Sequence, residues 1–310
     1  MAGHHHSHGH GDAHGHSHGA RGNWPFVVGM AINLAFVAVE AVFGLIAEST
    51  ALLADAGHNL GDVLALGLAW AGRVLAQRLP SRQFTYGLRG SSILAALVNA
   101  MTLMLVTGAI AWEAIQRLHA PVEVASRTVI VVALCGIFVN GASALLFLRD
   151  RAHDINVRAA FLHLAVDALV SLGVVLVGVG VLSTGWTWLD PAASLVISAI
   201  IIAGTWGLLR DTLRLSLHAV PPHVDAEAVR GYLVATSGVA EIHDLHIWGM
   251  STTETALTVH LVMPQGHPGD GVLAQLCHEL HERFRIGHAT IQIETGDKAH
   301  PCALAPDQVV

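Results

Sequence analysis

Long apolar runs, each about the length of a helix that can cross a bilayer, fill the first two thirds of the chain. The hydrocarbon core of a bilayer is roughly 30 Å thick, so a spanning helix needs about 20 mostly apolar residues. Polar residues within these runs are few. We predict six transmembrane helices, near residues 24–47, 51–77, 90–117, 127–149, 157–183 and 189–210.

After Arg210 the pattern changes to short alternating elements. A helix is predicted near residues 225–236, followed by the strand-like segments EIHDLHIWGM and ETALTVHLVM, a helix over 271–284 and a last strand, HATIQIETG. The second strand alternates apolar and polar positions with period two, which is typical of a strand with one buried face. The order αββαβ predicts a small open sheet carrying two helices, a separate cytosolic α+β domain.

Composition agrees with an α-helical membrane protein, since 53% of the 310 residues are hydrophobic and only 13% are charged. The formal net charge is −7 and Lys298 is the only lysine, so no basic surface for nucleic acid is expected. We expect four regions: a disordered tail (1–22), a six-helix membrane domain (23–210), a cytosolic domain for metal binding and dimerisation (211–297) and a loose tail (298–310).

Arginines fall mainly on one side of the predicted spans. The first twenty residues are histidine and glycine rather than a signal peptide, so the tail is expected to stay in the cytoplasm. The positive-inside rule then places both termini there, and arginine-rich, lysine-poor usage suits a bacterial inner membrane. The inner side has Arg73, Arg78, Arg82, Arg89, Arg149, Arg151, Arg158, Arg210 and Arg214, against Arg117 and Arg127 outside.

The amino-terminal tail interleaves histidine with glycine and serine. Such a tract cannot build a core, but its imidazoles are good ligands for borderline metals. An expression tag is the alternative, although the irregular spacing favours a native metal-collecting tail. The histidines are His4, His5, His6, His8, His10, His14, His16 and His18.

Two HxxxD pairs lie inside predicted spans. His58 and Asp62 occur in span two, and His163 and Asp167 in span five. Residues four apart share one helix face, and ionisable groups in a membrane are costly enough that they usually serve a function. The pairs are therefore candidate ligands of one site, with Asp55 as a weaker candidate or a carboxylate that orients His58; a polar network joining the helices is the alternative.

Other polar residues in the spans are isolated. Asn33, Glu40, Asn99 and Asn140 are expected to bond between helices or to line a path. The three cysteines, Cys135, Cys277 and Cys302, show no disulfide-framework spacing.

Several motifs together identify a family resemblance. They are ALLADAGHNLGD in span two, FTYG with Arg89 in the next loop, HLAVD in span five, and VAEIHDLHIW and TIQIE near the end. With six spans and a histidine-rich start, the chain resembles the cation diffusion facilitator family, close to its zinc-transporting branch, from about Trp24 to Glu294. The resemblance implies a homodimeric antiporter, not an enzyme, that exports Zn²⁺ from the cytoplasm in exchange for protons.

Carried over by position, the resemblance implies a transport site of His58, Asp62, His163 and Asp167. Zn²⁺ takes four nitrogen and oxygen ligands in a tetrahedron, and two carboxylates balance its charge. An imidazole, with an ordinary pKa of about 6.5, can exchange metal for a proton, so His163 or His58 is the expected proton carrier.

In the carboxy-terminal domain the resemblance implies a second, regulatory Zn²⁺ site at His243, His260 and Glu294, with His246 and Cys302 as further candidates. The chain departs from some relatives here. Gln292 stands where some have a histidine ligand, and Glu294 replaces an aspartate, so a single ion is expected rather than two. The loop QRLPSRQFTYG has no histidine or aspartate, and an additional metal site known there in parts of the family is expected to be absent.

Three alternatives remain. The transported ion could be cadmium, cobalt, nickel or iron, whereas manganese and magnesium prefer oxygen ligands. The protein could instead be a membrane-bound metal buffer or sensor. A metalloenzyme is disfavoured because no HExxH-like arrangement sets a general base beside a histidine pair.

Overall fold

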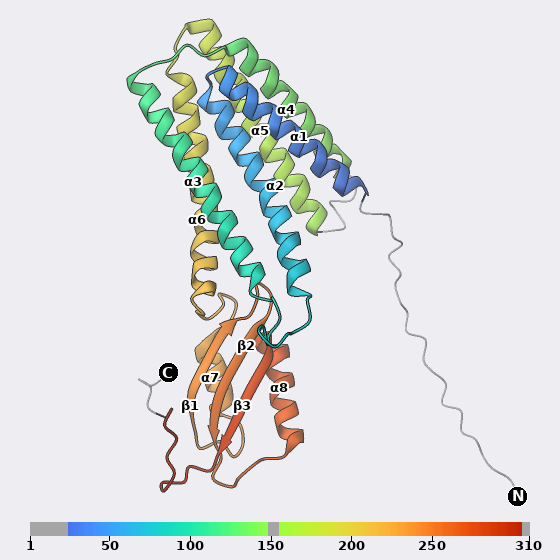
Figure 1. Cartoon of the computed structure of the whole chain (residues 1–310), viewed down its shortest axis with the longest axis vertical. Coiled ribbons are helices and arrows are strands. Elements are labelled where there is room, and N and C mark those ends of the chain that lie inside the picture. The colour runs from blue at the N-terminus through green and yellow to red at the C-terminus, as the bar shows by residue number, and fades with distance from the viewer. Residues whose placement is uncertain (1–23, 148–154, 306–310) are drawn as a thin grey trace, which may run out of the picture.

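The computed structural model describes residues 24–147 and 155–305; the predicted histidine-rich tail lies outside these ranges. Within them, six long helices run side by side as a bundle, and a domain of three strands and two helices lies at one end (Figure 1). The bundle consists of α1 (Trp24–Ile46), α2 (Thr50–Ala76), α3 (Ser91–His119), α4 (Ser126–Phe147), α5 (Ile155–Thr184) and α6 (Leu189–Ser216).

Each predicted span coincides with one of these helices. The largest difference is at α6, which continues to Ser216 although the apolar run ends near Arg210. Residues 211–216 include no glycine or proline, so the charges end the apolar run without ending the helix.

The bundle has the surface of a membrane protein. Among the described helices, those over Ser91–His119, Ser126–Leu145, Leu164–Thr184 and Leu189–Ser216 are long and apolar enough to cross a bilayer. The apolar segment described in α1, Ile32–Ile46, is shorter, and α2 carries the polar residues of one HxxxD pair. Large apolar side chains such as Leu105 and Phe138 point outward, as expected where lipid rather than water surrounds the helices.

A carboxylate on α6 joins α6 to the start of α2 at the end of the bundle that lies away from the small domain. The side chain of Asp190 is buried and accepts hydrogen bonds from the backbone N–H of Thr50 (2.7 Å), from the Thr50 hydroxyl (2.9 Å) and from the Ser49 hydroxyl. The first N–H groups of a helix have no partner within the helix, so α6 caps α2. This contact fixes the depth of α2 relative to α6.

The small domain contains α7 (Ala226–Val234), β1 (Glu241–Gly249), β2 (Thr255–Val262), α8 (Asp270–Phe284) and β3 (Ile286–Glu294), in the predicted αββαβ order. The central strand β2 pairs antiparallel with β1 and parallel with β3. Asp225 caps α7 by accepting from the N–H groups of Glu227 and Ala228.

Both helices of this domain pack on one face of the sheet. The core contains Leu233 of α7, Leu280 of α8 and the predicted apolar face of β2, Leu257, Val259 and Leu261, all fully buried. Because side chains alternate along a strand, the intervening positions of β2, including His260, face the opposite side.

The domain touches the bundle through the turn between β1 and β2. The backbone N–H of Thr252 donates to the Ser92 hydroxyl at the start of α3 (3.1 Å). Arg89, just before α3, pairs with Glu254. In the same loop, the ring of Tyr86 lies edge-on to His288 at the start of β3.

Candidate metal sites

Three of the ligands predicted within the membrane come together between α2 and α5. Nε2 of His58 lies 3.3 Å from Oδ1 of Asp167 and 3.8 Å from Oδ2 of Asp62. One donor atom from each residue lies within 4.8 Å of the other two. Ligands at about 2.0–2.2 Å around a tetrahedral ion are roughly 3.3–3.6 Å apart, so the His58–Asp167 distance fits one Zn²⁺ and the His58–Asp62 distance is slightly longer. We call His58, Asp62 and Asp167 the membrane cluster.

The fourth predicted ligand, His163, belongs to α5 by its backbone, four residues before Asp167. Helix geometry places these two residues on one face. The side chain of His163 lies outside the described part of the structure, so its participation stays a prediction.

The membrane cluster is partly open. The side chains of His58 and Asp62 are 23% and 32% exposed, whereas that of Asp167 is 3% exposed. An ion could therefore reach the cluster from the α2 side while Asp167 holds it against α5.

Asp55, the weaker candidate, makes different contacts. Its Oδ2 accepts a hydrogen bond from the Ser171 hydroxyl of α5 (2.8 Å), and its carboxyl group contacts that of Glu40 on α1. Glu40 also accepts from the Asn59 amide of α2 (3.2 Å), which is the interhelical bonding expected for an isolated polar residue. Asn59 and Ser171 carried no sequence signal, since only the packing of the helices brings them to the carboxylates.

A second group of donors lies on the sheet face that the helices leave uncovered. His243 of β1 and His260 of β2 are direct cross-strand partners. Nδ1 of His260 lies 2.9 Å from Oε1 of Glu294, and Nε2 of His243 lies 3.3 Å from its Oε2. Donor atoms of His243, His260, Glu294 and Cys302 all lie within 4.8 Å of one another. We call these four residues the cytosolic cluster.

Cys302 reaches the sheet because the segment after β3 folds back. Its Sγ lies 3.6 Å from Nδ1 of His260. A backbone hydrogen bond with Leu304 favours the thiolate, but burial and the carboxylates of Glu294 and Asp244 outweigh it and raise the pKa of the Cys302 thiol. A metal ion binding there must displace the thiol proton.

Glu294 is held in its charged form. Burial by itself raises the pKa of this carboxyl, but hydrogen bonds with Cys302 and Gln292 and the nearby imidazoles of His243 and His260 outweigh burial and lower it below its ordinary value. The amide of Gln292 donates to Oε1 of Glu294 (2.9 Å). Gln292 thus positions the Glu294 carboxylate.

His246 lies apart from the cytosolic cluster. A bulge between His243 and His246 shifts the register of β1, and Asp244 within it adopts a left-handed backbone conformation, with φ of 51°. Oδ1 of Asp244 then lies 2.8 Å from Nε2 of His246, and Oδ2 lies 3.4 Å from Nε2 of His260. Asp244 therefore orients the His260 ring, a role that regular strand alternation gives no reason to expect.

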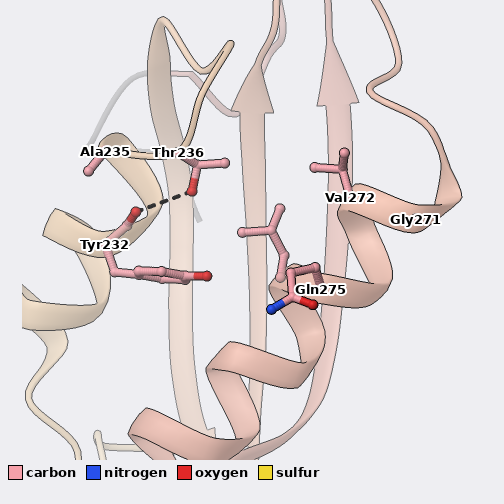
Figure 2. Close-up of a pocket in the computed structure, with 7 residues that line it drawn as sticks. Tyr232, Ala235, Thr236, Gly271, Val272 and Gln275 are labelled. Atoms are coloured by element: carbon pink, nitrogen blue, oxygen red, sulfur yellow. Dashed lines mark hydrogen bonds between the residues drawn. The ribbon is translucent and has the colours of Figure 1, made fainter.

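A pocket between α7 and α8, lined by Tyr232, Thr236, Val272 and Gln275 among others, lies on the helical side of the sheet (Figure 2). The Thr236 hydroxyl is already bonded to the Tyr232 carbonyl oxygen (3.2 Å). No histidine, cysteine or carboxylate is among its described lining residues. This pocket has no ligands for a metal ion.

Comparison with known proteins extends over both parts of the chain. Residues 26–215 match the family described as cation efflux transmembrane domain, and residues 221–296 match cation efflux protein, cytoplasmic domain. The two matches cover the bundle and the small domain.

Similar proteins are bacterial transporters. The metal cation efflux system protein CzcD of Cupriavidus metallidurans is 36% identical over 279 residues, 90% of this chain and 87% of that protein. The zinc transporter ZitB of Escherichia coli is 36% identical over 265 residues (85% and 84%). The cadmium, cobalt and zinc/H(+)-K(+) antiporter of Bacillus subtilis is 30% identical over 283 residues (90% and 91%).

A solved metal-bound carboxy-terminal domain of the C. metallidurans CzcD transporter is 42% identical, covering 23% of this chain and 99% of that domain, with a TM-score of 0.22. The matched ranges and relatives, with the helical bundle and its cytoplasmic domain, confirm the resemblance. The chain belongs to the cation diffusion facilitator family and is a multi-pass membrane transporter for cation efflux, not an enzyme.

Proposed function

We propose that this transporter exports Zn²⁺ from the cytoplasm in exchange for protons, through a site formed by His58, Asp62, Asp167 and His163. The observation that carries the proposal is the spacing of the three described donors: His58 lies 3.3 Å from Asp167 across α2 and α5, and 3.8 Å from Asp62 within α2. Two aspartates balance the charge of the ion, and two imidazoles complete a ligand set typical of zinc. The names of two relatives, a zinc transporter and a cadmium, cobalt and zinc/H(+)-K(+) antiporter, support zinc as a cargo.

Proton coupling follows from the ligands. An imidazole that releases its metal ion near neutral pH can take up a proton instead. Metal-bound and proton-bound forms are then alternatives of one site. A proton gradient drives export if the site loads metal from the cytoplasm and protons from the other side, with His58 or His163 as the carrier.

The cytosolic cluster is proposed to hold one regulatory Zn²⁺ with two imidazoles, one carboxylate and one thiolate. If Zn²⁺ binds more tightly to one arrangement of the two subunits of a homodimer, its binding would stabilise that arrangement. Its ligands come from β1, β2, β3 and the segment containing Cys302. The sequence assigned His243, His260 and Glu294 as its principal ligands, and Cys302 completes the four-donor set.

We further propose the fourfold division of the chain at residues 22, 210 and 297, although α6 continues past 210 and Cys302 returns from beyond 297 to the cytosolic domain. We also propose a bacterial inner membrane location with both termini in the cytoplasm, and a metal-collecting role for the tail. Cadmium and cobalt are the second candidate cargoes, because one relative is described as an antiporter for both as well as zinc. Geometry and metal supply, rather than affinity alone, decide among these ions.

The test is metal uptake into vesicles that contain the purified protein and an acidic lumen. Zinc should enter in exchange for lumenal protons, and Asp167→Asn should abolish uptake. Glu123→Gln, an exposed carboxylate in the loop before α4, is the matched control and should transport normally. Zinc binding without uptake by the wild type would favour a buffer or sensor. Faster uptake of Cd²⁺ than of Zn²⁺ would identify cadmium as the preferred cargo.

A further inference from the structure

Two buried carboxyl groups lie next to the membrane cluster. Glu40 of α1 and Asp55 of α2 are completely buried and contact each other side chain to side chain. Neither belongs to the membrane cluster. We call Glu40 and Asp55 the carboxyl pair.

Hydrogen bonds account for one oxygen of each carboxyl. Oε2 of Glu40 accepts from the Asn59 amide, and Oδ2 of Asp55 accepts from the Ser171 hydroxyl. The other two oxygens, Oε1 of Glu40 and Oδ1 of Asp55, are buried and have no donor in the described structure. These atoms can satisfy each other only if one of the two groups carries a proton, because a carboxylate accepts hydrogen bonds but cannot donate one.

Electrostatics also indicates that one of the two carboxyl groups carries a proton. Two adjacent carboxylates in a low-dielectric site cannot both be ionised cheaply, so such a pair holds a shared proton. Helix α4 packs tightly against α1 and α5 near the pair. A Cβ at Gly136 of α4 would lie 2.9 Å from Oγ of Ser171 and 3.0 Å from the Phe36 ring. Close packing there leaves little room for water to solvate a second charge.

The proton belongs on Glu40. Asp55 accepts from the Ser171 hydroxyl and precedes His58 by about one helical turn on α2, so it is placed to remain the acceptor of the pair. Its donor Ser171 lies one helical turn after Asp167 on α5, so the pair is close enough to the membrane cluster to sense its charge. On α4, the titratable side chains Arg127 and Cys135 are exposed and are not among the interactions of Glu40.

The pair lies on the outer side of the cluster. At 1.5 Å per residue, Asp55 is about 8 Å from the outer end of α2 at Thr50, whereas His58 and Asp62 are about 12 Å and 18 Å from it. Glu40 is about 9 Å from the corresponding end of α1 at Ile46. The pair therefore lies at a depth between the outer end of the bundle and the membrane cluster.

Resting on the proposed antiport, we propose that Glu40, hydrogen-bonded to Asp55, is a second proton site of the transporter and that its proton is exchanged for the metal ion. When a divalent cation occupies the membrane cluster, its positive charge favours ionisation of the neighbouring pair. The O–H bond of Glu40 breaks, the proton leaves as H⁺, and both carboxylates remain as anions beside the ion. When the ion leaves outward, a proton returns to Glu40.

The experiment counts protons released when Zn²⁺ is added to weakly buffered, detergent-solubilised full-length protein. His260→Ala and Cys302→Ser are present throughout to remove the cytosolic cluster. Glu40→Gln keeps a donor for Asp55 and an acceptor for Asn59 but cannot ionise. It should bind zinc with release of roughly one proton fewer per ion, whereas Glu123→Gln should match its parent.

Infrared difference spectra give an independent measurement. The parent should show a protonated carboxyl band that shifts in D₂O and disappears on zinc addition, and Glu40→Gln should lack it. Asp55→Asn, which replaces the carboxylate acceptor with an uncharged amide, should move this band in the metal-free protein, so the proposal stays testable if one variant folds poorly. An unchanged proton count in Glu40→Gln, or a parent without a zinc-sensitive carboxyl band, would overturn the proposal.

Calorimetry separates this outcome from failure of the proposed function. If Asp167→Asn binds as much zinc as its parent, the membrane cluster is not the metal site. If Glu40→Gln and its parent bind zinc with the same affinity and release the same number of protons, only the proposed role of the carboxyl pair is wrong.

Discussion

The membrane and cytosolic clusters use similar side chains but are held in different ways. In the membrane cluster, α2 supplies two donors one helical turn apart and α5 supplies the third, and the described residues form no backbone hydrogen bond between the two helices. In the cytosolic cluster, three donors lie on adjacent strands of one sheet, where backbone pairing fixes their register. His58 and Asp62 are partly exposed, whereas His243 and His260 are nearly buried.

This difference teaches what each arrangement is suited to do. Packed helices can rock against each other, so a site shared between two of them can open and release its ion. A site on a hydrogen-bonded sheet moves as one unit, and Asp244 and Gln292 further restrict its ligands. The first suits transport and the second suits retention of an ion.

Ligand loss in the two clusters should give the largest contrast. His58→Ala should reduce zinc transport by at least about 100-fold, because loss of a ligand costs no less than loss of a residue that orients one. His243→Ala should keep the rate at saturating zinc. Equal loss of uptake in both variants, measured in vesicles, would remove the separation of roles.

Metal removal should destabilise only one of the two domains appreciably. At a zinc concentration about 100 times the dissociation constant, binding to the cytosolic cluster stabilises the folded state by about 2.7 kcal/mol. Chelation should therefore lower the melting temperature of the cytosolic domain in the full-length protein, and His260→Ala should eliminate this response. A zinc-dependent melting temperature that persists in His260→Ala would place the retained ion elsewhere.

Replacing Cys302 should change the metal affinity and ligand set of the cytosolic cluster without changing the fold. Cys302→Ser should weaken binding at the cytosolic cluster by roughly tenfold, since hydroxyl is a poorer ligand than thiolate for zinc. With Co²⁺ bound in an Asp167→Asn background, the parent should show a sulfur-to-cobalt charge-transfer absorption that the serine variant lacks. The same absorption in Cys302→Ser would exclude this sulfur, and Cys277→Ser is the matched control.

The junction between the two domains should give the smallest effect. Arg89 and Glu254 form an ion pair, but both side chains are largely exposed, 40% and 44%. Exposed pairs contribute about 0.2–1 kcal/mol, so a double-mutant cycle of Arg89→Ala and Glu254→Ala should give a coupling free energy in that range at low salt. A larger value would mean that the two domains share one rigid structure.

Much of this protein was determined by the sequence itself. Apolar runs of spanning length gave the six helices, because a bilayer leaves few other conformations for such segments. His58 and Asp62 could be paired from their spacing alone, since helix periodicity places residues four apart on one face. Period-two alternation in β2 likewise identified its buried face, Leu257, Val259 and Leu261.

Tertiary structure decided which groups from distant segments meet. Asp167 reaches His58 only because α5 packs on α2, and Cys302 reaches His260 only because the segment after β3 folds back. Glu40 gave no sign in the sequence of contacting Asp55, because the contact depends on the rotation of α1 about its axis. Local periodicity fixes the faces of single elements, but the partners of a buried charge are set by packing between them.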